Sequence, residues 1–362
     1  MINLNEFKRI VLIIPSLRHG GAERVISILA NQWAKDAKLN ITLILLTKQV
    51  QYYELDDRVT IIEPVRTYKN NSASKFLYTL WSLKFIRSEV SKIKPDTILS
   101  FCEIYNNLVL LSLIGLNYKI FVSDRNNPDN NLGKLHENLR KVLYKNASGI
   151  IAQTKNGKEI LYHKTKNKNI VNIPNPLRPI NEHDTVKEKI ILNVGRNEDQ
   201  KNQLELIDIF SELHNAKEWK LYILGNGELR NQLDRKVVDL GLKSRVVLMD
   251  FQSDIDLYFQ KSSIFAFPSL YEGFPNALSE AMANNLPCVV YDCPTGPAEM
   301  IEDTVNGFLI PLKDKQRFIS KLQLLVDNES LRKEIGNEAS KIKEKVAVNK
   351  ICDKYLNTIL EI

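Results

Sequence analysis

Two carboxylates with seven residues between them stand in the stretch PSLYEGFPNALSEAM, residues 268–282. Glu272 lies in a short polar segment, and Glu280 lies in the first turns of a predicted helix. Pro275 marks the start of that helix, because a missing N–H costs nothing in the first turn. Such a pair could be catalytic, could clamp a nucleotide, or could be one loop acid and one capping acid.

The same helix predicts a place for an anion. The amides of Asn276, Ala277 and Leu278 would point outward from its N-terminus, which carries the positive end of the helix dipole. An anion at this end leaves Glu280 poorly placed for phosphate but well suited to accept hydrogen bonds from hydroxyl groups. The two carboxylates therefore need not share one role.

Two cations follow a predicted strand in NVGRNEDQKNQ, residues 193–203. Arg196 and Lys201 flank an acidic turn before a helix that begins near Gln203. Arginine can bind a diphosphate through two hydrogen bonds, and lysine supplies a compact charge. The alternative is a solvated surface pair.

A glycine-rich loop follows the first predicted strand, in PSLRHGGAER at 15–24. Gly20 and Gly21 would let the backbone approach a ligand at a helix N-terminus. The loop is not GxGxxG, and the chain has no GxxxxGK[ST], so dinucleotide and P-loop sites are disfavoured. A simple glycine-rich turn is the alternative.

Short runs of Ile and Val alternate with helix-length segments along the whole chain. Strands that are apolar throughout and alternate with helices indicate parallel sheets covered on both faces. The predicted strands are 10–14, 41–46, 59–62, 97–101, 119–123, 149–153, 189–195, 220–225, 245–249, 264–268 and 287–291. The fold class is therefore α/β, with two Rossmann-like doubly wound domains facing across a cleft.

A segment with three prolines, residues 172–185, predicts a linker between the two domains. We expect the first domain to span residues 1–178 and the second to span residues 179–345. The segment 346–362 contains a predicted amphipathic helix, which could close the second domain or cross back onto the first.

Charge differs between the two halves of the 362-residue chain. Residues 1–180 carry 27 basic and 14 acidic residues, a net +13, whereas the remainder carries 23 and 29, a net −6. This asymmetry favours an anionic partner for the first half: a membrane surface, a phosphorylated acceptor or nucleic acid. A general lysine bias of the source is the alternative.

A predicted helix at 75–94 combines aromatic and aliphatic residues with lysine and arginine, as a helix lying on an anionic bilayer would. The alternative is a helix that covers the sheet with its basic residues outward. The four cysteines show no metal-binding spacing and indicate a reduced, cytosolic protein. We find neither a signal peptide nor an apolar run of membrane-spanning length.

Taken together, these motifs resemble the retaining glycosyltransferases of the GT-B fold in family 4. The resemblance covers nearly the whole chain, and each motif alone is weak. The matching stretches, in the order expected for the family, are GGAER (20–24), GRNEDQKNQ (195–203), LGNGELR (224–230), EGFPNALSE (272–280), PCVVYDCPTGPAEMI (287–301) and NGFLI (306–310).

The resemblance implies roles at the donor site. Arg196 and Lys201 would bind the diphosphate of a nucleotide-sugar, Glu280 would hold the ribose hydroxyls, and Glu272 would contact the transferred sugar. UDP is the donor nucleotide most common in the family. The remaining implied donor contacts are Gly20, Gly21, Gly225, Gly227, Phe251, Gln252, Phe274, Pro275, Asn276, Ala277 and Leu278.

CPTGPAEM and SDRNNP (123–128) resemble a subgroup that extends lipid-linked glycans, O-antigen, capsule or lipopolysaccharide core. The implied acceptor is a lipid-linked glycan, and the implied location is the inner face of the cytoplasmic membrane. Many members of the family carry a histidine after the strand that corresponds to the predicted strand 119–123, whereas this chain has Asp124 and Arg125 there. The predicted acceptor contacts are Glu103, Asn106, Asn107, Asp124 and Arg125.

We expect no cofactor, and no metal because no convincing DxD is present, so protein groups must stabilise the leaving group. Retention then requires either a nucleophile on the opposite face of the sugar or front-face attack assisted by the departing phosphate. We favour front-face transfer, with Arg196, Lys201 and Glu272 as the catalytic group. Three alternatives remain. The protein could be a GT-B UDP-sugar epimerase or hydrolase, an inactive sugar-nucleotide sensor, or a nucleic-acid-binding protein, for which no recognition motif is present.

Overall fold

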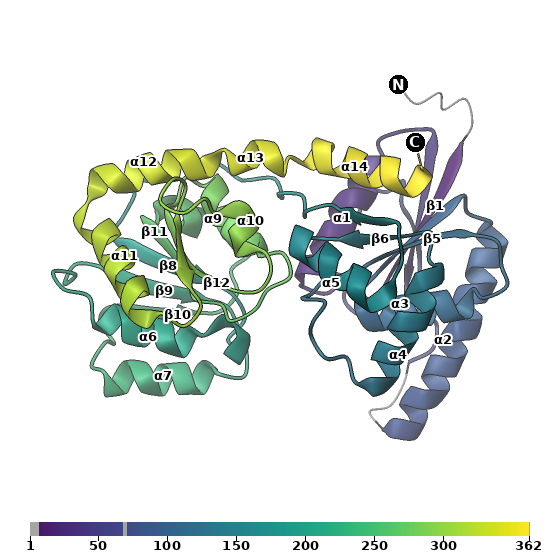
Figure 1. The fold of residues 1–362 in the computed structure, drawn as a ribbon, viewed down its shortest axis with the longest axis horizontal. Coiled ribbons are helices and arrows are strands. Elements are labelled where there is room, and N and C mark those ends of the chain that lie inside the picture. Colours follow the sequence, from purple (N-terminus) through teal and green to yellow (C-terminus); the bar gives the residue numbers. More distant parts are fainter. Residues whose placement is uncertain (1–6, 68–70, 362) are drawn as a thin grey trace. The chain divides into compact units, whose positions relative to one another are not determined.

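The computed structural model describes residues 7–67 and 71–361. Its contacts divide the chain into two units, Met1–Pro176 with Ala347–Ile362, and Leu177–Val346 (Figure 1). The sequence analysis drew its boundaries after residues 178 and 345. Its domain spans include residues 1–6, 68–70 and 362, which lie outside the described residues.

A seven-stranded parallel sheet forms the centre of the first unit, in the spatial order β3-β2-β1-β4-β5-β6-β7. The chain starts in the middle of the sheet and winds outward in both directions, which defines a doubly wound fold. The strands are β1 (Lys8–Ile14), β2 (Leu39–Leu45), β3 (Thr60–Ile62), β4 (Thr97–Phe101), β5 (Lys119–Ser123), β6 (Gly149–Ala152) and β7 (Ile170–Asn172).

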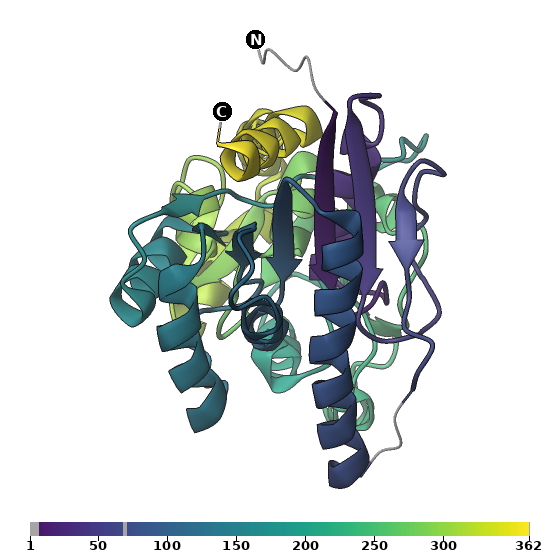
Figure 2. The same ribbon diagram turned by 90° about the vertical axis from the view of Figure 1, so that its right-hand side faces the viewer.

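Helices cover both faces of this sheet. α1 (Gly21–Trp33) and α14 (Val348–Leu360) pack on one face. Four helices pack on the other face: α2 (Ser72–Ile93), α3 (Glu103–Ser112), α4 (Lys134–Leu143) and α5 (Lys155–Thr165). Figure 2 shows the N-terminal turns of α2 extending beyond the strands.

The C-terminal helix α14 belongs to the first unit. Its buried residues, Ile351, Cys352, Tyr355, Leu356 and Ile359, recur at helical spacing and enter the core beside α1. The Trp33 indole N–H donates to the carbonyl of Cys352 at 3.2 Å. Of the two placements that the sequence left open, the structure has the helix on the first unit.

A six-stranded parallel sheet forms the second unit, in the order β10-β9-β8-β11-β12-β13. The strands are β8 (Ile190–Val194), β9 (Lys220–Leu224), β10 (Val246–Met249), β11 (Ile264–Phe267), β12 (Cys288–Asp292) and β13 (Phe308–Pro311). The helices are α6 (Gln203–Ser211), α7 (Arg230–Asp239), α8 (Asp256–Lys261), α9 (Asn276–Ala283), α10 (Pro297–Met300), α11 (Lys315–Asp327), α12 (Glu329–Ser340) and α13 (Ile342–Lys345).

The two parallel sheets confirm the predicted α/β class with two Rossmann-like units. Each of the eleven predicted strands has a counterpart in the structure. The short strands β7 and β13 were not predicted as strands, because runs of three or four residues carry little periodicity. No helix in the described part of the chain combines the length and apolarity that crossing a membrane requires.

Candidate active site

The candidate site lies in the second unit, at the edge of the sheet where the parallel strands end. The loops that follow β8, β9 and β11 carry most of the residues predicted to bind a nucleotide-sugar. Parallel strands that point the same way bring the loops at their carboxyl ends to one edge. Because β8 lies between β9 and β11, these three loops are neighbours.

An ion pair joins the loops after β8 and β11. Lys201 Nζ lies 2.5 Å from Glu272 Oε1, and the two side chains are only 15% and 7% exposed. The Lys201 ammonium also lies 5.2 Å from the centre of the Phe267 ring. The sequence analysis had given Lys201 and Glu272 separate roles and did not predict that they pair.

Backbone contacts beside this ion pair hold the same two loops together. The Gln200 side chain donates to the carbonyl of Tyr271 at 2.7 Å, and the amide of Leu270 donates to the carbonyl of Gln200 at 2.9 Å. Two neutral hydrogen bonds therefore fix the spacing at which Lys201 and Glu272 meet. The pair is part of a cross-linked loop structure and not a contact between two mobile side chains.

The loop after β9 packs directly against the loop after β8. The amide of Asn197 donates to the carbonyl of Asn226, and the amide of Leu229 donates to the carbonyl of Asn197. Gly225 has a φ of +147°, and a Cβ built there would lie 2.0 Å from the carbonyl oxygen of Gly195. A Cβ on Gly227 would lie 2.4 Å from the carbonyl oxygen of Asn197. Close loop packing alone therefore requires both glycines.

The segment predicted to lie near the base contacts this loop. The Asn226 side chain accepts from the amide of Phe251 at 2.7 Å, and the Phe251 residue is 38% exposed. Gln252 donates to the carbonyl of Asp250 at 3.0 Å. The structure thus brings Phe251 and the Gly225–Gly227 loop together, as a shared role requires.

Arg196 pairs with a different carboxylate from the one that Lys201 contacts. Its guanidinium forms an ion pair with Glu198 at 2.9 Å, and its side chain is 67% exposed. An exposed pair of this kind contributes at most about 1 kcal/mol, so it opens at little cost when a stronger anion is present. The structure therefore distinguishes a fixed cation, Lys201, from a mobile one, Arg196.

The N-terminus of α9 corrects one expectation. Pro275 occupies the position that precedes the helix, and the helix itself runs from Asn276 to Ala283. The amide of Leu278 donates to the carbonyl of Pro275 at 3.0 Å, so it does not face outward, and the Leu278 side chain is in the core. The predicted anion site is therefore limited to the amides before Leu278.

The loop after β12 closes against the loop that carries Glu272. Thr295 Oγ1 donates to the carbonyl of Glu272. Gly296 has a φ of +98°, and a Cβ there would lie 2.5 Å from Pro275 Cδ and 2.9 Å from the carbonyl oxygen of Gly273. These contacts give a physical reason for the CPTGP stretch, which the sequence analysis noted only as a family match.

Glu280 is almost buried, at 4% exposure. Its carboxylate lies 3.6 Å from the Nε atom of Arg178, which also binds Asp256. The sequence analysis did not identify Arg178, because a lone arginine in a proline-rich segment gives no local signal of its partner.

In the first unit, Gly20 precedes α1 and contacts a residue that the sequence analysis missed. The Tyr53 hydroxyl donates to the carbonyl of Gly20 at 2.9 Å and accepts from its amide at 3.4 Å. Burial raises the pKa of Tyr53, which keeps the hydroxyl neutral and able to donate. Tyr53 thus fixes the backbone of the loop that contains Gly20 and Gly21.

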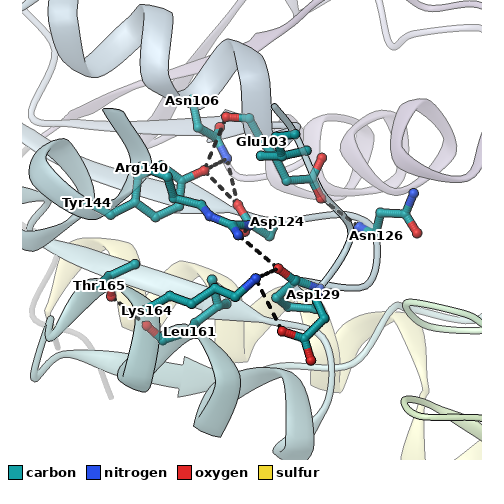
Figure 3. A network of polar contacts seen from close by, with 12 residues as sticks. Glu103, Asn106, Asp124, Asn126, Asp129, Arg140, Tyr144, Leu161, Lys164 and Thr165 are labelled. Carbon is teal, nitrogen blue, oxygen red and sulfur yellow. Dashed lines mark hydrogen bonds and ion pairs between the residues drawn. The ribbon is translucent and has the colours of Figure 1, made fainter. Parts of the chain in front are cut away.

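Three of the predicted acceptor residues, Glu103, Asn106 and Asp124, belong to a polar network around the loop after β5 (Figure 3). Glu103 Oε1 accepts from the amides of Arg125 and Asn126 at 2.7 and 2.8 Å. Arg140 and Lys164 both donate to the carbonyl of Pro128, at 2.9 and 2.7 Å. These bonds fix the loop from both sides.

Three of the predicted acceptor residues are buried beneath that loop. Asn106, Asn107 and Asp124 are 0%, 1% and 2% exposed. Asp124 accepts from the Tyr144 hydroxyl at 2.7 Å and from Asn106 at 3.3 Å, and lies 3.5 Å from Arg140. This burial corrects their assignment as direct acceptor contacts: they support the loop from below.

The environment of Asp124 changes its titration. Burial, followed by repulsion from the Glu103 carboxylate, raises the pKa of Asp124 to about 7, against the opposing effect of Arg140. A catalytic base would need access to the acceptor hydroxyl, and the buried Asp124 carboxyl does not provide it. Asp124 therefore does not replace the missing histidine.

Arg125 has a structural role that the sequence analysis did not predict. Its guanidinium donates to the Tyr355 hydroxyl at 3.1 Å and to Asn175 Oδ1 at 2.7 Å, and stacks 4.4 Å from the centre of the Phe101 ring. Arg125 thus links β5 to the C-terminal helix α14. Glu103 is half-buried and stays a candidate for acceptor contact.

Among the described residues, no group of three or more His, Cys, Asp or Glu side chains is arranged to hold a metal ion. The described site contains two cations, Arg196 and Lys201, two carboxylates, Glu272 and Glu280, and loop amides. This set can bind a diphosphate and hydroxyl groups.

We predict that Gly225→Ala destabilises the second unit by about 2–4 kcal/mol, because the Cβ overlaps the Gly195 carbonyl at a strained φ. Gly241→Ala is the matched control: Gly241 has a φ of +68° and no atom within 4 Å of a built Cβ. It should cost about 1 kcal/mol. Hydrogen exchange of the β8 and β9 amides measures both effects, and equal costs would contradict the packing argument.

Comparison with known proteins shows which proteins this chain is similar to. Residues 178–342 match the model of the family described as glycosyl transferases group 1. The amylovoran biosynthesis glycosyltransferase AmsD of Erwinia amylovora is 29% identical over 345 residues, which cover 92% of this chain and 94% of that protein. An alpha-1,4-N-acetyl-D-galactosaminyltransferase of Campylobacter jejuni, whose name includes a PP-undecaprenol-linked glycan, is 26% identical over 364 residues, covering 98% and 99%.

Solved structures agree in fold. Anabaena HepE in complex with UDP and glucose has a TM-score of 0.79 at 15% identity, covering 98% of this chain and 100% of that chain. At this identity the likeness concerns the fold, which is GT-B. Residues 178–342 therefore match the glycosyl transferases group 1 model, and the chain as a whole has the GT-B fold.

Proposed function

We propose that this protein is a retaining glycosyltransferase of bacterial polysaccharide biosynthesis. It would transfer a hexose or N-acetylhexosamine from a nucleotide-sugar, a UDP-sugar in our proposal, to a lipid-linked or cell-surface glycan. The observation that carries the proposal is the Lys201–Glu272 pair at the junction of the loops after β8 and β11. The relatives support the donor and acceptor classes, since HepE was solved with UDP and the C. jejuni enzyme is named for an undecaprenol-linked glycan.

The leaving diphosphate needs positive charge as the glycosidic bond breaks. Lys201 is fixed by the Glu272 carboxylate and by the stacking contact with Phe267, so its charge is already in place before the donor binds. Arg196 can leave Glu198 and add a second, bidentate contact. With both cations on the diphosphate, the reaction needs no metal ion and no other cofactor.

Glu272 carries the sugar-binding part of the proposal. Its side chain is 7% exposed and its Oε1 atom is bonded to Lys201, and the positive charge of Lys201 makes the carboxylate a weaker nucleophile. A carboxylate that accepts hydrogen bonds from sugar hydroxyls can keep the pair intact. We therefore favour front-face transfer, in which the departing phosphate accepts the proton of the incoming hydroxyl, with Glu272 as a sugar contact. A covalent glycosyl-Glu272 intermediate in the mass spectrum would contradict this choice.

We expect Lys201→Ala and Arg196→Ala each to remove about 2–4 kcal/mol of transition-state stabilisation, because each takes away a charge from the leaving group. The assay combines UDP- or GDP-sugars with polyprenyl-diphosphate glycans and follows nucleotide release and product mass. Lys217→Ala, an exposed lysine before β9, should leave the rate unchanged. EDTA should also leave it unchanged.

Several outcomes of this assay would count against the proposal. Near-full activity in both Lys201→Ala and Arg196→Ala would contradict the assignment of these two cations to the leaving diphosphate. Hydrolysis or epimerisation of the donor without an acceptor would favour the epimerase alternative. DNA binding without binding of any nucleotide-sugar would favour the nucleic-acid alternative.

The lipid-linked acceptor implies contact with an anionic membrane surface, and the first unit has a surface for it. In the first turns of α2, Phe76, Leu77 and Leu80 are 63%, 64% and 43% exposed. On α4, Leu135 and Val142 are 68% and 62% exposed. Both helices cover the same face of the first sheet.

Lysines accompany these exposed apolar residues. Lys75 and Lys84 lie on α2, and Lys134 and Lys141 lie on α4, and all four are exposed. Apolar side chains flanked by lysines suit the headgroup region of an anionic bilayer. We therefore propose that α2 and α4 meet the inner face of the cytoplasmic membrane.

We expect the protein to bind vesicles containing anionic phospholipid at low salt, and the double variant Phe76→Asp/Leu77→Asp to bind about tenfold more weakly, because it loses apolar burial and gains repulsion. Val238→Asp, on α7 of the second unit and 48% exposed, is the matched control and should bind like wild type. Co-sedimentation measures both. The membrane proposal fails if the wild-type protein does not bind anionic vesicles, or if the double variant binds them as tightly as wild type.

A further inference from the structure

Arg178 connects two acidic residues of the second unit that lie far apart in the sequence. Its two terminal nitrogens, Nη1 and Nη2, each donate to one oxygen of Asp256 at 2.7 Å. Its third nitrogen, Nε, lies 3.6 Å from Glu280 Oε2. One guanidinium thus faces two carboxylates, in the segment that leads into the second unit.

Asp256 fixes the orientation of the guanidinium. The Asp256 side chain is 1% exposed, and its Oδ2 atom also accepts from the amide of Asn181 at 2.8 Å. A bidentate Arg–carboxylate pair has a planar geometry with little rotational freedom. Because both terminal nitrogens bind Asp256, the position of the Nε atom is set before anything binds at Glu280.

Glu280 needs this cation for a physical reason. Its side chain is only 5% exposed, and a carboxylate that is nearly removed from water requires a compensating charge or donor. Arg178 approaches Oε2, so it restricts the rotation of the carboxylate group. A hydrogen-bond acceptor for ribose hydroxyls is effective only when its lone pairs keep a fixed direction.

We propose that Arg178 is a positioning residue for the donor nucleotide. Held by Asp256, it orients the Glu280 carboxylate toward the ribose hydroxyls and so makes binding sensitive to the presence of those hydroxyls. The inference rests on the proposed donor role of Glu280. A merely structural role, in which Arg178 only holds residues 177–181 on the unit, would affect stability and not ribose recognition.

The test compares UDP with 2′,3′-dideoxy-UDP by isothermal titration calorimetry. The ratio of their dissociation constants measures ribose recognition, and wild type should prefer UDP by about tenfold or more. Arg178→Lys keeps a positive charge but loses the fork, so UDP should bind about tenfold more weakly and the ratio should fall to within about threefold of unity. Glu280→Gln should lower the ratio in the same way.

Two further variants make the result decisive. Arg317→Lys alters an exposed arginine of the same unit, 48% exposed and 4.0 Å from Asp303, and should leave both affinities unchanged. Asp256→Asn removes the charge that fixes Arg178 and should lower the ratio as Arg178→Lys does, which covers the case in which Arg178→Lys does not fold. Circular dichroism checks that each variant is folded at the titration temperature.

The outcomes distinguish the positioning role of Arg178 from the donor role of Glu280. In one outcome, wild type binds UDP with a clear ribose preference, Glu280→Gln abolishes that preference, and folded Arg178→Lys and Asp256→Asn both retain it. The proposed role of Arg178 is then wrong, and the donor role of Glu280 stands. If wild type does not bind UDP, or binds both nucleotides equally, the donor assignment of Glu280 is wrong and this inference falls with it.

Discussion

The ion pair between Lys201 and Glu272 is the contact on which the candidate site depends. It joins the loop after β8 to the loop after β11, and both side chains are largely removed from water. A charge pair with so little solvent around it is screened weakly, and loss of one partner would leave the other charge uncompensated. The hydrogen bond from Gln200 to Tyr271 holds the loops after β8 and β11 at the spacing that the pair requires. Close packing at Gly225 and Gly227 holds the loop after β9 against the loop after β8.

The first unit contains an extended network of neutral and charged groups, including the buried Arg140–Asp124 pair. Glu103, Arg140 and Lys164 fix the loop after β5 through its backbone (Figure 3), and Arg125 joins β5 to Tyr355 of the C-terminal helix. The loop that would meet an acceptor is therefore held by one buried residue, Arg140, and by two partly exposed residues, Glu103 and Lys164. The C-terminal helix α14 thus supports a loop that lies more than two hundred residues earlier in the sequence.

Sequence patterns were sufficient for the fold and for the position of the site, but not for its contacts. Buried strands such as β1 have continuous apolar runs, which are recognisable in the sequence. Because the strands are parallel, the loops at their carboxyl ends meet at one edge of the sheet. Burial of single polar residues was not predictable: Asp124 follows a strand end, where exposure is usual, yet Tyr144 and Arg140 cover it. Long-range partners such as Arg178 and Glu280, or Arg125 and Tyr355, have no local signature, because neither residue type nor spacing specifies which distant group will lie opposite.

The most direct test of the central claim is a double-mutant cycle on UDP binding with Lys201→Met, Glu272→Gln and the double variant, because UDP has the diphosphate but no sugar. Our account predicts that Lys201→Met weakens UDP binding about tenfold or more, that Glu272→Gln weakens it by a smaller factor because Lys201 is no longer held in place, and that the double variant binds like Lys201→Met. Affinities within threefold of wild type in all three variants would contradict it. So would a loss in Glu272→Gln as large as that in Lys201→Met.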